Sequence, residues 1–353
     1  VRRLAEARAG EGRVLDPGTK GQEAEAALEA LDAARGYYLA LVDAQPSDAR
    51  LRRDFAQVQR DRAAIQRRLG KRAEAIGSIR SAIQLLEELT WASPGHLETR
   101  LALASSFGLL AQLQSERDES LPAAAVTLDR ALHVLDAAVG PDKGSPRLEA
   151  DKAARLVDLS ELRYTAGDPD GAIDAAANAG AILEKLVERF PGEPSYRTEL
   201  AAACNQAAEA LRTRNRRAEA LARAERAQAL LERLMAEQPD NADHPAAMAT
   251  SRQIRGRILA LEGRTAEALK AFQGAADLLE SLKNRTGADS YALACNLSLG
   301  LSLIGAPEGG RPIEDGSALP EADRMRRDVY ARRAVSSLRK AVAQGYDDYD
   351  LYR

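Results

Sequence analysis

Small and large apolar residues alternate along the chain in a pattern that recurs about every 48 residues. Each copy has an alanine, a residue four positions later that is larger in most copies, and a second alanine three positions after that. The copies are Ala27/Leu31/Ala34, Ala75/Ile79/Ala82, Ala124/Leu128/Ala131, Ala172/Ala176/Ala179, Ala220/Ala224/Ala227, Ala268/Phe272/Ala275 and Ala334/Leu338/Ala341. Because positions four and seven apart share one face of an α-helix, each copy predicts a helix that packs closely against another helix.

Helix-breaking residues recur with the same period. Successive first alanines are 48, 49, 48, 48 and 48 residues apart, and the last copy follows after 66 residues, one period plus an insertion of 18. Nineteen residues after the alanine stand Pro46, Pro94, Pro191, Pro239 and Gly287, and five residues before it stand Gly70, Gly167, Asn215 and Gly263. Proline ends a helix, and glycine or asparagine supplies a left-handed cap. Each period therefore predicts two antiparallel helices, A and B, joined by a short turn.

One helix pair cannot bury its own apolar face, so the pairs are expected to stack. The predicted fold is an all-α solenoid of about seven antiparallel helix pairs that occupies residues 21–353 as one domain, after a leader at residues 1–20 that is flexible around Gly10. The insertion at about residues 305–320 is rich in Gly and Pro and predicts a mobile surface loop. Aromatic residues make up only 4% of the chain, which fits helix crossings built on alanine.

These features resemble the tetratricopeptide repeat, with the best match at Gly256, Gly263, Ala268, Phe272 and Ala275. The resemblance implies a right-handed superhelix whose A helices line a concave groove that binds a peptide or protein. The period departs from the family's usual length of about 34 residues, so each helix is expected to be about two turns longer.

The resemblance also implies which residues line the groove, since the family's groove positions lie 15, 11 and 8 residues before the first core alanine. The polar residues at these positions are Arg60, Arg67, Glu161, Tyr164, Asn205, Glu209, Arg212, Gln253 and Arg257. Arginines and amides there are suited to gripping a peptide carboxylate or backbone. The Lys/Asn clamp of chaperone-binding members is not reproduced, and an ordinary solvated helix position is the alternative for each residue.

A narrower resemblance rests on residues 51–54 and 70–75, on Tyr291–Cys295, and on residues 334–342 with Gly345-Tyr346. These segments look like the long-period repeat region that follows the catalytic domain in planctomycete-type bacterial serine/threonine protein kinases. The resemblance implies that the chain is a regulatory or sensing fragment of such a kinase, in the cytoplasm or beside a membrane. This is the alternative to our first hypothesis, a non-catalytic scaffold that binds a peptide or protein, with the cytoplasm as its default compartment.

Charge is nearly balanced over the whole chain, at a net −3, but not locally. Residues 48–72 hold nine basic and three acidic side chains, an excess of charge suited to an acidic protein, a phosphopeptide or lipid headgroups. Phe55 is the single aromatic residue among these charges, too few for a series of stacked bases, so nucleic acid is not expected. A solvated face paired with nearby glutamates is the alternative.

Motifs for catalysis are missing from the sequence. It contains no phosphate-binding glycine loop and none of the kinase signatures. His96, His133 and His244 fall in three different repeats without metal-ligand spacing, and Cys204 and Cys295 read as buried thiols. We therefore predict no enzyme activity in this chain and no cofactor or metal. No apolar run is long enough to span a membrane.

Overall fold

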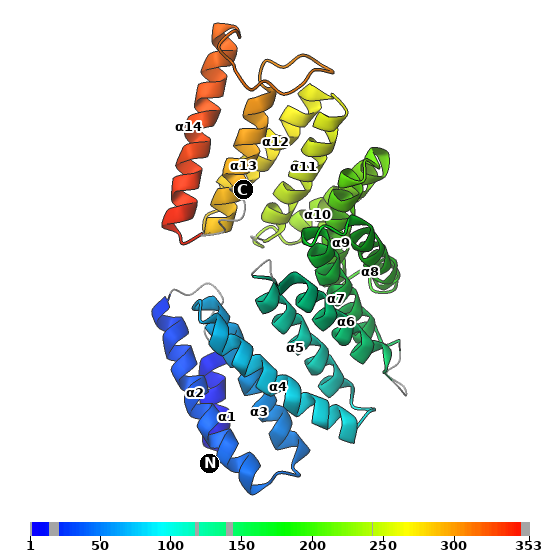
Figure 1. Ribbon diagram of the computed structural model, residues 1–353, viewed down its shortest axis with the longest axis vertical. Coiled ribbons are helices and arrows are strands. Elements are labelled where there is room, and N and C mark those ends of the chain that lie inside the picture. Colours follow the sequence, from blue (N-terminus) through cyan, green and yellow to red (C-terminus); the bar gives the residue numbers. More distant parts are fainter. Residues whose placement is uncertain (1, 14–20, 117–119, 139–143, 242, 347–353) are drawn as a thin grey trace. The chain divides into compact units, whose positions relative to one another are not determined.

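The computed structural model describes residues 2–13, 21–116, 120–138, 144–241 and 243–346, and within them it forms fourteen α-helices and no strand (Figure 1). The helices are α1 (Arg2–Arg13), α2 (Gly21–Ala44), α3 (Ala49–Arg68), α4 (Arg72–Ala92), α5 (Leu97–Ser115), α6 (Leu121–Asp136), α7 (Pro146–Thr165), α8 (Pro169–Arg189), α9 (Pro194–Thr213), α10 (Arg217–Glu237), α11 (Asp243–Leu261), α12 (Thr265–Ser281), α13 (Gly287–Leu303) and α14 (Glu321–Ala343). The all-α prediction is confirmed.

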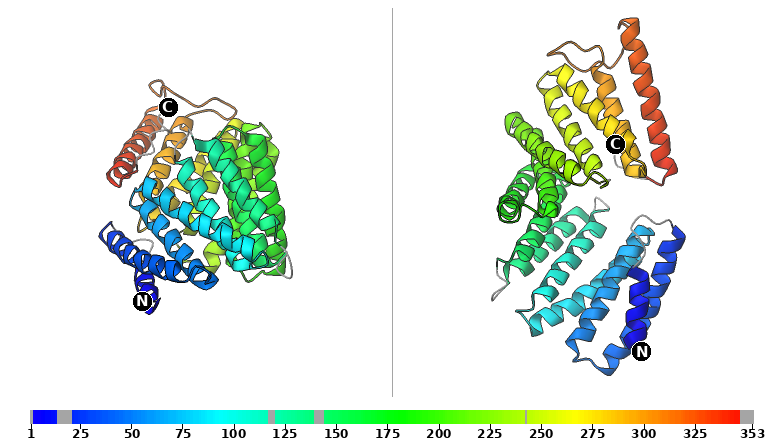
Figure 2. Two further views of the ribbon diagram at one scale, coloured as in Figure 1. Left: turned by 60° about the horizontal axis from the view of Figure 1, so that its bottom comes forward. Right: turned by 180° about the vertical axis from the view of Figure 1, so that it is seen from behind.

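The helices form two compact units, residues 1–168 with α1 to α7 and residues 169–353 with α8 to α14. Within each unit, helices that follow one another in sequence pack side by side (Figures 1 and 2). The pairs are α1/α2, α3/α4 and α5/α6 in the first unit, and α9/α10, α11/α12 and α13/α14 in the second. Stacked helix pairs are thus confirmed, while one continuous superhelix over residues 21–353 stays a prediction.

The recurring alanines of the sequence pattern mark the contact face of the B helices, which carry even numbers. Both alanines of every copy are at most 5% exposed, and most are fully buried. On α12, Phe272 fills the space beside Gly256 of α11, where a β-carbon would lie only 2.7 Å from the ring. Small residues at the crossing therefore let the A and B helices approach closely, as the pattern predicts.

The turns between the A and B helices have the predicted left-handed residue. The φ angles are 71° at Gly70, 79° at Gly167, 60° at Asn215 and 75° at Gly263. After Gly70, the amide of Lys71 donates to the carbonyl of Gln66 at 2.8 Å, which closes the end of α3. Glycine and asparagine occupy these positions because other side chains are strained at positive φ.

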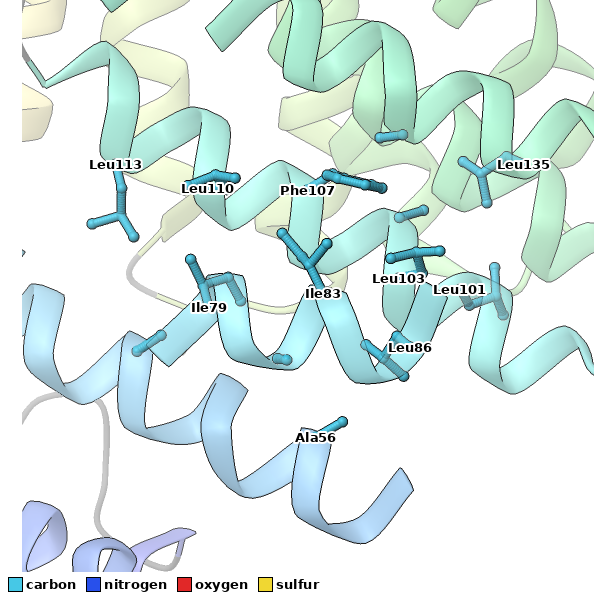
Figure 3. Close-up of a cluster of buried hydrophobic side chains, with 14 of the residues drawn as sticks. Ala56, Ile79, Ile83, Leu86, Leu101, Leu103, Phe107, Leu110, Leu113 and Leu135 are labelled. Atoms are coloured by element: carbon cyan, nitrogen blue, oxygen red, sulfur yellow. The ribbon is translucent and has the colours of Figure 1, made fainter. Parts of the chain in front are cut away.

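The core is aliphatic, and its clusters extend over neighbouring helix pairs within each unit. Figure 3 shows one such cluster in the first unit, where Leu110 and Leu113 of α5 point toward Ile79 and Ile83 of α4. The only aromatic ring in this cluster is Phe107, which is 1% exposed. A core of this kind explains how few aromatic residues the chain needs.

The N-terminal residues differ from the flexible leader that the sequence predicts around Gly10. Residues 2–13 form helix α1, which packs against α2 as the A helix of the first pair, while residues 14–20 lie outside the described residues. Ala9 of α1 is 1% exposed and belongs to the same apolar cluster as Ala27 and Leu31. A buried alanine contact outweighs the low helix propensity of the glycines.

The insertion between α13 and α14 is non-helical, as predicted, but it is anchored. Its amides at Gly309 and Ile313 donate to the carbonyls of Gly263 and Ser302 at 2.8 and 2.7 Å. The buried side chain of Arg327 on α14 donates to the carbonyls of Leu301 (2.9 Å), Ile313 (3.1 Å) and Glu314 (3.3 Å). The expectation of a mobile loop is therefore corrected, because backbone groups far apart in sequence hold it in place.

Candidate functional site

The A helices, which carry odd numbers, contact one another as well as their B partners. Neighbouring A helices touch at α3/α5 and α5/α7 in the first unit and at α9/α11 and α11/α13 in the second. All nine candidate residues lie on these helices: Arg60 and Arg67 on α3, Glu161 and Tyr164 on α7, Asn205, Glu209 and Arg212 on α9, and Gln253 and Arg257 on α11. The candidates thus fall on A helices in both units, although their role in binding stays a prediction.

In the first unit, Arg67 and Glu161 line the same pocket of about 340 Å³ between α3, α5, α6 and α7. Leu121, Leu128 and Leu162 contribute its apolar wall. Arg67 donates to the carboxylate of Glu116 at 2.8 Å and to the side chain of Gln112 at 3.1 Å, so its charge is already engaged. Tyr164, one turn beyond Glu161, is half-buried and does not line this pocket.

The two carboxyl groups that α7 contributes to this pocket, those of Asp158 and Glu161, both have raised pKa values. The surrounding protein atoms raise the pKa of Glu161, and the nearby Asp158 carboxylate raises it further. Burial also raises the pKa of Asp158, although Arg155 opposes the shift from 2.8 Å away. The Arg155 guanidinium occupies the space over Gly108 of α5, where a β-carbon would clash with it. The groove positions of the family include Glu161 but not Asp158, so the sequence pointed to only one of these two carboxyl groups.

Arg60 lies beside a second pocket, of about 360 Å³, with Gln57 and Arg53 of the same helix and Ser105 of α5. Arg60 donates to the side chain of Gln57 at 3.0 Å. Burial lowers the pKa of Arg60, while the carboxylates of Asp61 and Asp151 oppose that shift. The structure therefore separates Arg60 from Arg67, two residues that the sequence placed in one groove.

In the second unit, three candidate residues form one charged group. Glu209 accepts hydrogen bonds from Arg212 on its own helix, at 2.7 and 3.1 Å, and from Arg257 of α11 at 2.8 Å. The Glu209 side chain is only 13% exposed, whereas that of Arg257 is 42% exposed. Two arginines share one carboxylate, so the group has a net charge of +1.

Asn205 and Gln253 lie outside this charged group. Asn205 is buried one turn before Glu209, and its side-chain oxygen accepts no hydrogen bond from the described part of the chain. Gln253 is half-buried on α11, four residues before Arg257. Neither residue lines the pocket that Arg212 and Arg257 share.

That pocket, of about 240 Å³, is mainly apolar and was not found from the sequence. Besides the two arginines, its lining includes Leu261, Phe272, Leu299 and Leu303 from the helices and Pro312 from the insertion. Leucines near helix ends and a proline in a Gly/Pro-rich loop look unremarkable in sequence. A recognisable signal was the insertion itself, the single break in an otherwise constant period.

The basic run at residues 48–72 is less positive than its sequence count indicates. Four of its arginines form ion pairs with carboxylates from other parts of the first unit: Arg52 with Glu88, Arg62 with Asp32, and Arg67 and Arg72 with Glu116. These pairs support the alternative of a solvated face paired with acidic neighbours.

The described residues hold no group of three or more histidine, cysteine or acidic side chains arranged to bind a metal ion. Cys204 is buried, and burial raises the pKa of its thiol. His96 caps the N-terminus of α5 by accepting a hydrogen bond from the amide of Thr99 at 3.2 Å. None of the helices in the described ranges combines the length and the apolar character that crossing a bilayer requires.

The helix pairs, their left-handed turns and their buried alanines define a repeat protein of the tetratricopeptide-like fold. Solved structures support this: BtubC (BKLC) from P. vanneervenii has a TM-score of 0.55 and 16% identity, covering 77% of this chain and 92% of that chain. The apo form of RapI has a TM-score of 0.50 and 12% identity, covering 96% of this chain and 98% of that one. No family model and no curated protein matches the sequence. At these identities the likeness shows the fold alone.

Proposed function

We propose that the chain is a non-catalytic scaffold that binds a protein or peptide on the A-helix faces of its units. The observation that carries this proposal is the presence, on A helices of both units, of pockets of about 240 to 360 Å³ that combine apolar surface with charged side chains. Their volumes lie at or below the lower end of the range of small-molecule sites, about 300–1,000 Å³, and are suited to individual side chains of a bound peptide.

An acidic partner is the second part of the proposal. In the first unit the argument for an acidic partner is weaker than the sequence indicates, because four of the nine basic side chains in residues 48–72 form ion pairs within the unit. In the second unit the support for an acidic partner is the net positive group of Arg212, Arg257 and Glu209, whose two arginines line an apolar pocket. Complementary charge gives specificity and faster association to such contacts.

Affinity capture from the native lysate tests the scaffold, with the whole chain as bait. A charge-reversed bait, Arg60→Glu with Arg67→Glu and Arg68→Glu, changes α3, whereas Arg80→Glu with Arg226→Glu and Arg233→Glu makes the same change on exposed positions of B helices. The scaffold proposal predicts proteins that both the wild type and the B-helix bait retain and that the α3 bait loses, with circular dichroism confirming that each bait is folded. Capture of nothing by the wild type overturns the scaffold. Equal capture by all three baits overturns a role for α3.

A second candidate function is the regulatory region of a bacterial serine/threonine protein kinase. Its support is the sequence resemblance, whose segments fall near the start of α3, at the turn into α4, on α13, and on and just after α14. The coding sequence upstream of Val1 tests it. A catalytic domain with His-Arg-Asp and Asp-Phe-Gly motifs supports this function, and an independent reading frame without one overturns it.

A further inference from the structure

The anchored insertion forms part of a binding pocket in the second unit. Residues 305–320 run from the end of α13 across the ends of α11 and α12 (Figures 1 and 2). Besides the bond from Gly309 to Gly263, Thr265 of α12 donates from its hydroxyl to the carbonyl of Pro307 at 3.1 Å, and the amide of Ala266 donates to the Glu308 carboxylate at 3.2 Å. The insertion is therefore fixed to the turn between α11 and α12.

This course brings Pro312 to the apolar pocket of about 240 Å³ at the C-terminal ends of the A helices. Leu261 ends α11, and Leu299 and Leu303 belong to the last turns of α13. Leu261 is 47% exposed, so about half of its side chain faces solvent beside the other apolar residues of the lining. The pocket thus exposes apolar surface that the helix pairs do not cover.

The lining of the pocket includes a positive charge, that of Arg257, which is only partly engaged. Arg257 donates one hydrogen bond, from Nη1 to Glu209, and its guanidinium is 42% exposed. Toward the described residues, its Nε and Nη2 donate no hydrogen bond. A guanidinium with free, exposed N–H groups beside apolar surface is suited to binding a carboxylate.

We propose that this pocket binds an acidic peptide segment in which a large aliphatic side chain stands next to an aspartate or glutamate. The aliphatic side chain lies between Leu261, Leu303 and Pro312, and the neighbouring carboxylate accepts hydrogen bonds from Arg257. The proposal rests on the scaffold function proposed above and names the partner's chemistry. A basic segment is disfavoured by the net charge of +1 on Arg212, Arg257 and Glu209.

Selection of short random peptides displayed on phage against the whole chain tests the proposal without assuming a sequence. We expect enrichment of Leu, Ile or Met within one or two positions of Asp or Glu. The best peptide, made synthetically with a fluorescent label, is then titrated against wild type and variants. Leu261→Asp is expected to weaken binding by about tenfold or more and Arg257→Gln by about tenfold, because each removes one of the two contacts.

Two matched variants serve as controls in the same unit. Val335→Asp makes the apolar-to-acid change at a site that is 49% exposed on α14, and Arg324→Gln removes an exposed arginine from the same helix. Both are expected to keep the affinity within about twofold of wild type. Circular dichroism of each variant checks that loss of binding is not loss of folding.

The outcomes separate this proposal from the scaffold function. Enrichment of basic peptides, no enrichment at all, or equal binding by wild type, Leu261→Asp and Arg257→Gln overturns the pocket's assignment. The scaffold stands or falls separately, on the capture of proteins by the wild-type bait.

Discussion

Left-handed residues at the ends of helices show what a single side chain contributes in this fold. Gly263 and Gly345 both follow a helix, with φ angles of 75° and 80°. They differ in their surroundings: a β-carbon on Gly263 would lie 2.8 Å from the α-carbon of Gly309 in the insertion, whereas one on Gly345 would meet nothing within 4 Å.

This difference predicts unequal costs for the same substitution. Gly345→Ala is expected to destabilise the second unit by about 1–2 kcal/mol, the cost of left-handed backbone for alanine. Gly263→Ala is expected to cost more, because the new methyl group also displaces Gly309. Urea denaturation followed by circular dichroism measures both variants. Equal denaturation midpoints for the two variants would show that Gly309 of the insertion does not pack closely against Gly263.

The pocket carboxylate Glu161 predicts a pH dependence. Its pKa is raised in the folded chain, so the folded state binds this proton more tightly than the unfolded state does. The stability that this group contributes is present at low pH and is lost as the pH rises through the raised pKa. Glu161→Gln has no carboxyl group here and does not lose this stability. The melting temperature of the variant minus that of wild type should therefore increase between pH about 4.5 and pH about 7.

Glu267→Gln provides a control of opposite sign. Arg264 lowers the pKa of Glu267, so wild type gains from this carboxylate above its ordinary pKa and loses that gain on acidification. The difference in melting temperature between Glu267→Gln and wild type should therefore become smaller as the pH falls below about 4.5. A difference in melting temperature between Glu161→Gln and wild type that stays constant with pH would contradict a raised pKa of Glu161.

At the scale of helices, the alanine pattern determines how closely each pair packs. Ala268 of α12 is fully buried, while Ala266 in the same turn is exposed. Ala268→Leu is expected to overpack the α11/α12 contact and to cost about 1–3 kcal/mol, whereas Ala266→Leu should be nearly neutral. Thermal melting compares the two. Equal melting temperatures would show that the helix face is assigned incorrectly.

The insertion depends on one side chain of α14. Arg327 is 8% exposed and donates three hydrogen bonds to backbone carbonyls of residues 301, 313 and 314. Arg327→Met keeps a long side chain but removes these bonds. Hydrogen exchange of the Ile313 amide, which bonds to Ser302, should become faster, while exchange within α9 and α10 stays unchanged. An unchanged rate at Ile313 would show that the insertion is held by other contacts.

The parts of the fold that the sequence predicts are those that repeat. Buried alanines and left-handed turn residues recur at constant spacing, so each copy supports the others. Pairings of polar side chains do not recur in this way. Arg67 donates a hydrogen bond to Glu116, 49 residues later in the sequence, and Arg257 donates one to Glu209, 48 residues earlier. One period separates each pair, which brings adjacent A helices together, but the sequence does not show which polar residues face each other. The anchored insertion was missed because backbone carbonyls hold it, and these leave no sequence signal.

Over the whole molecule, the constant period predicts that one complete repeat is dispensable for folding. Each helix contacts mainly its neighbours, so removing a full period leaves equivalent surfaces facing each other. The N-terminal ends of the B helices α10 and α12 have the same ion pair. Arg216 pairs with Glu219 at 2.7 Å, and Arg264 pairs with Glu267 at 2.7 Å. Deleting residues 220–267, which is 48 residues, therefore joins α9 to α12 in register.

The shortened chain should remain helical and melt cooperatively, at a lower temperature because one interface is lost. Deleting residues 220–265 instead shifts the register by two positions and turns the apolar face of α12 by about 200°, since each residue of a helix advances about 100°. This matched deletion should lose cooperative melting and bind a dye specific for exposed apolar surface. Similar melting of the two deletions would show that the unit tolerates any shortening, and that the 48-residue period does not set the packing of its helices.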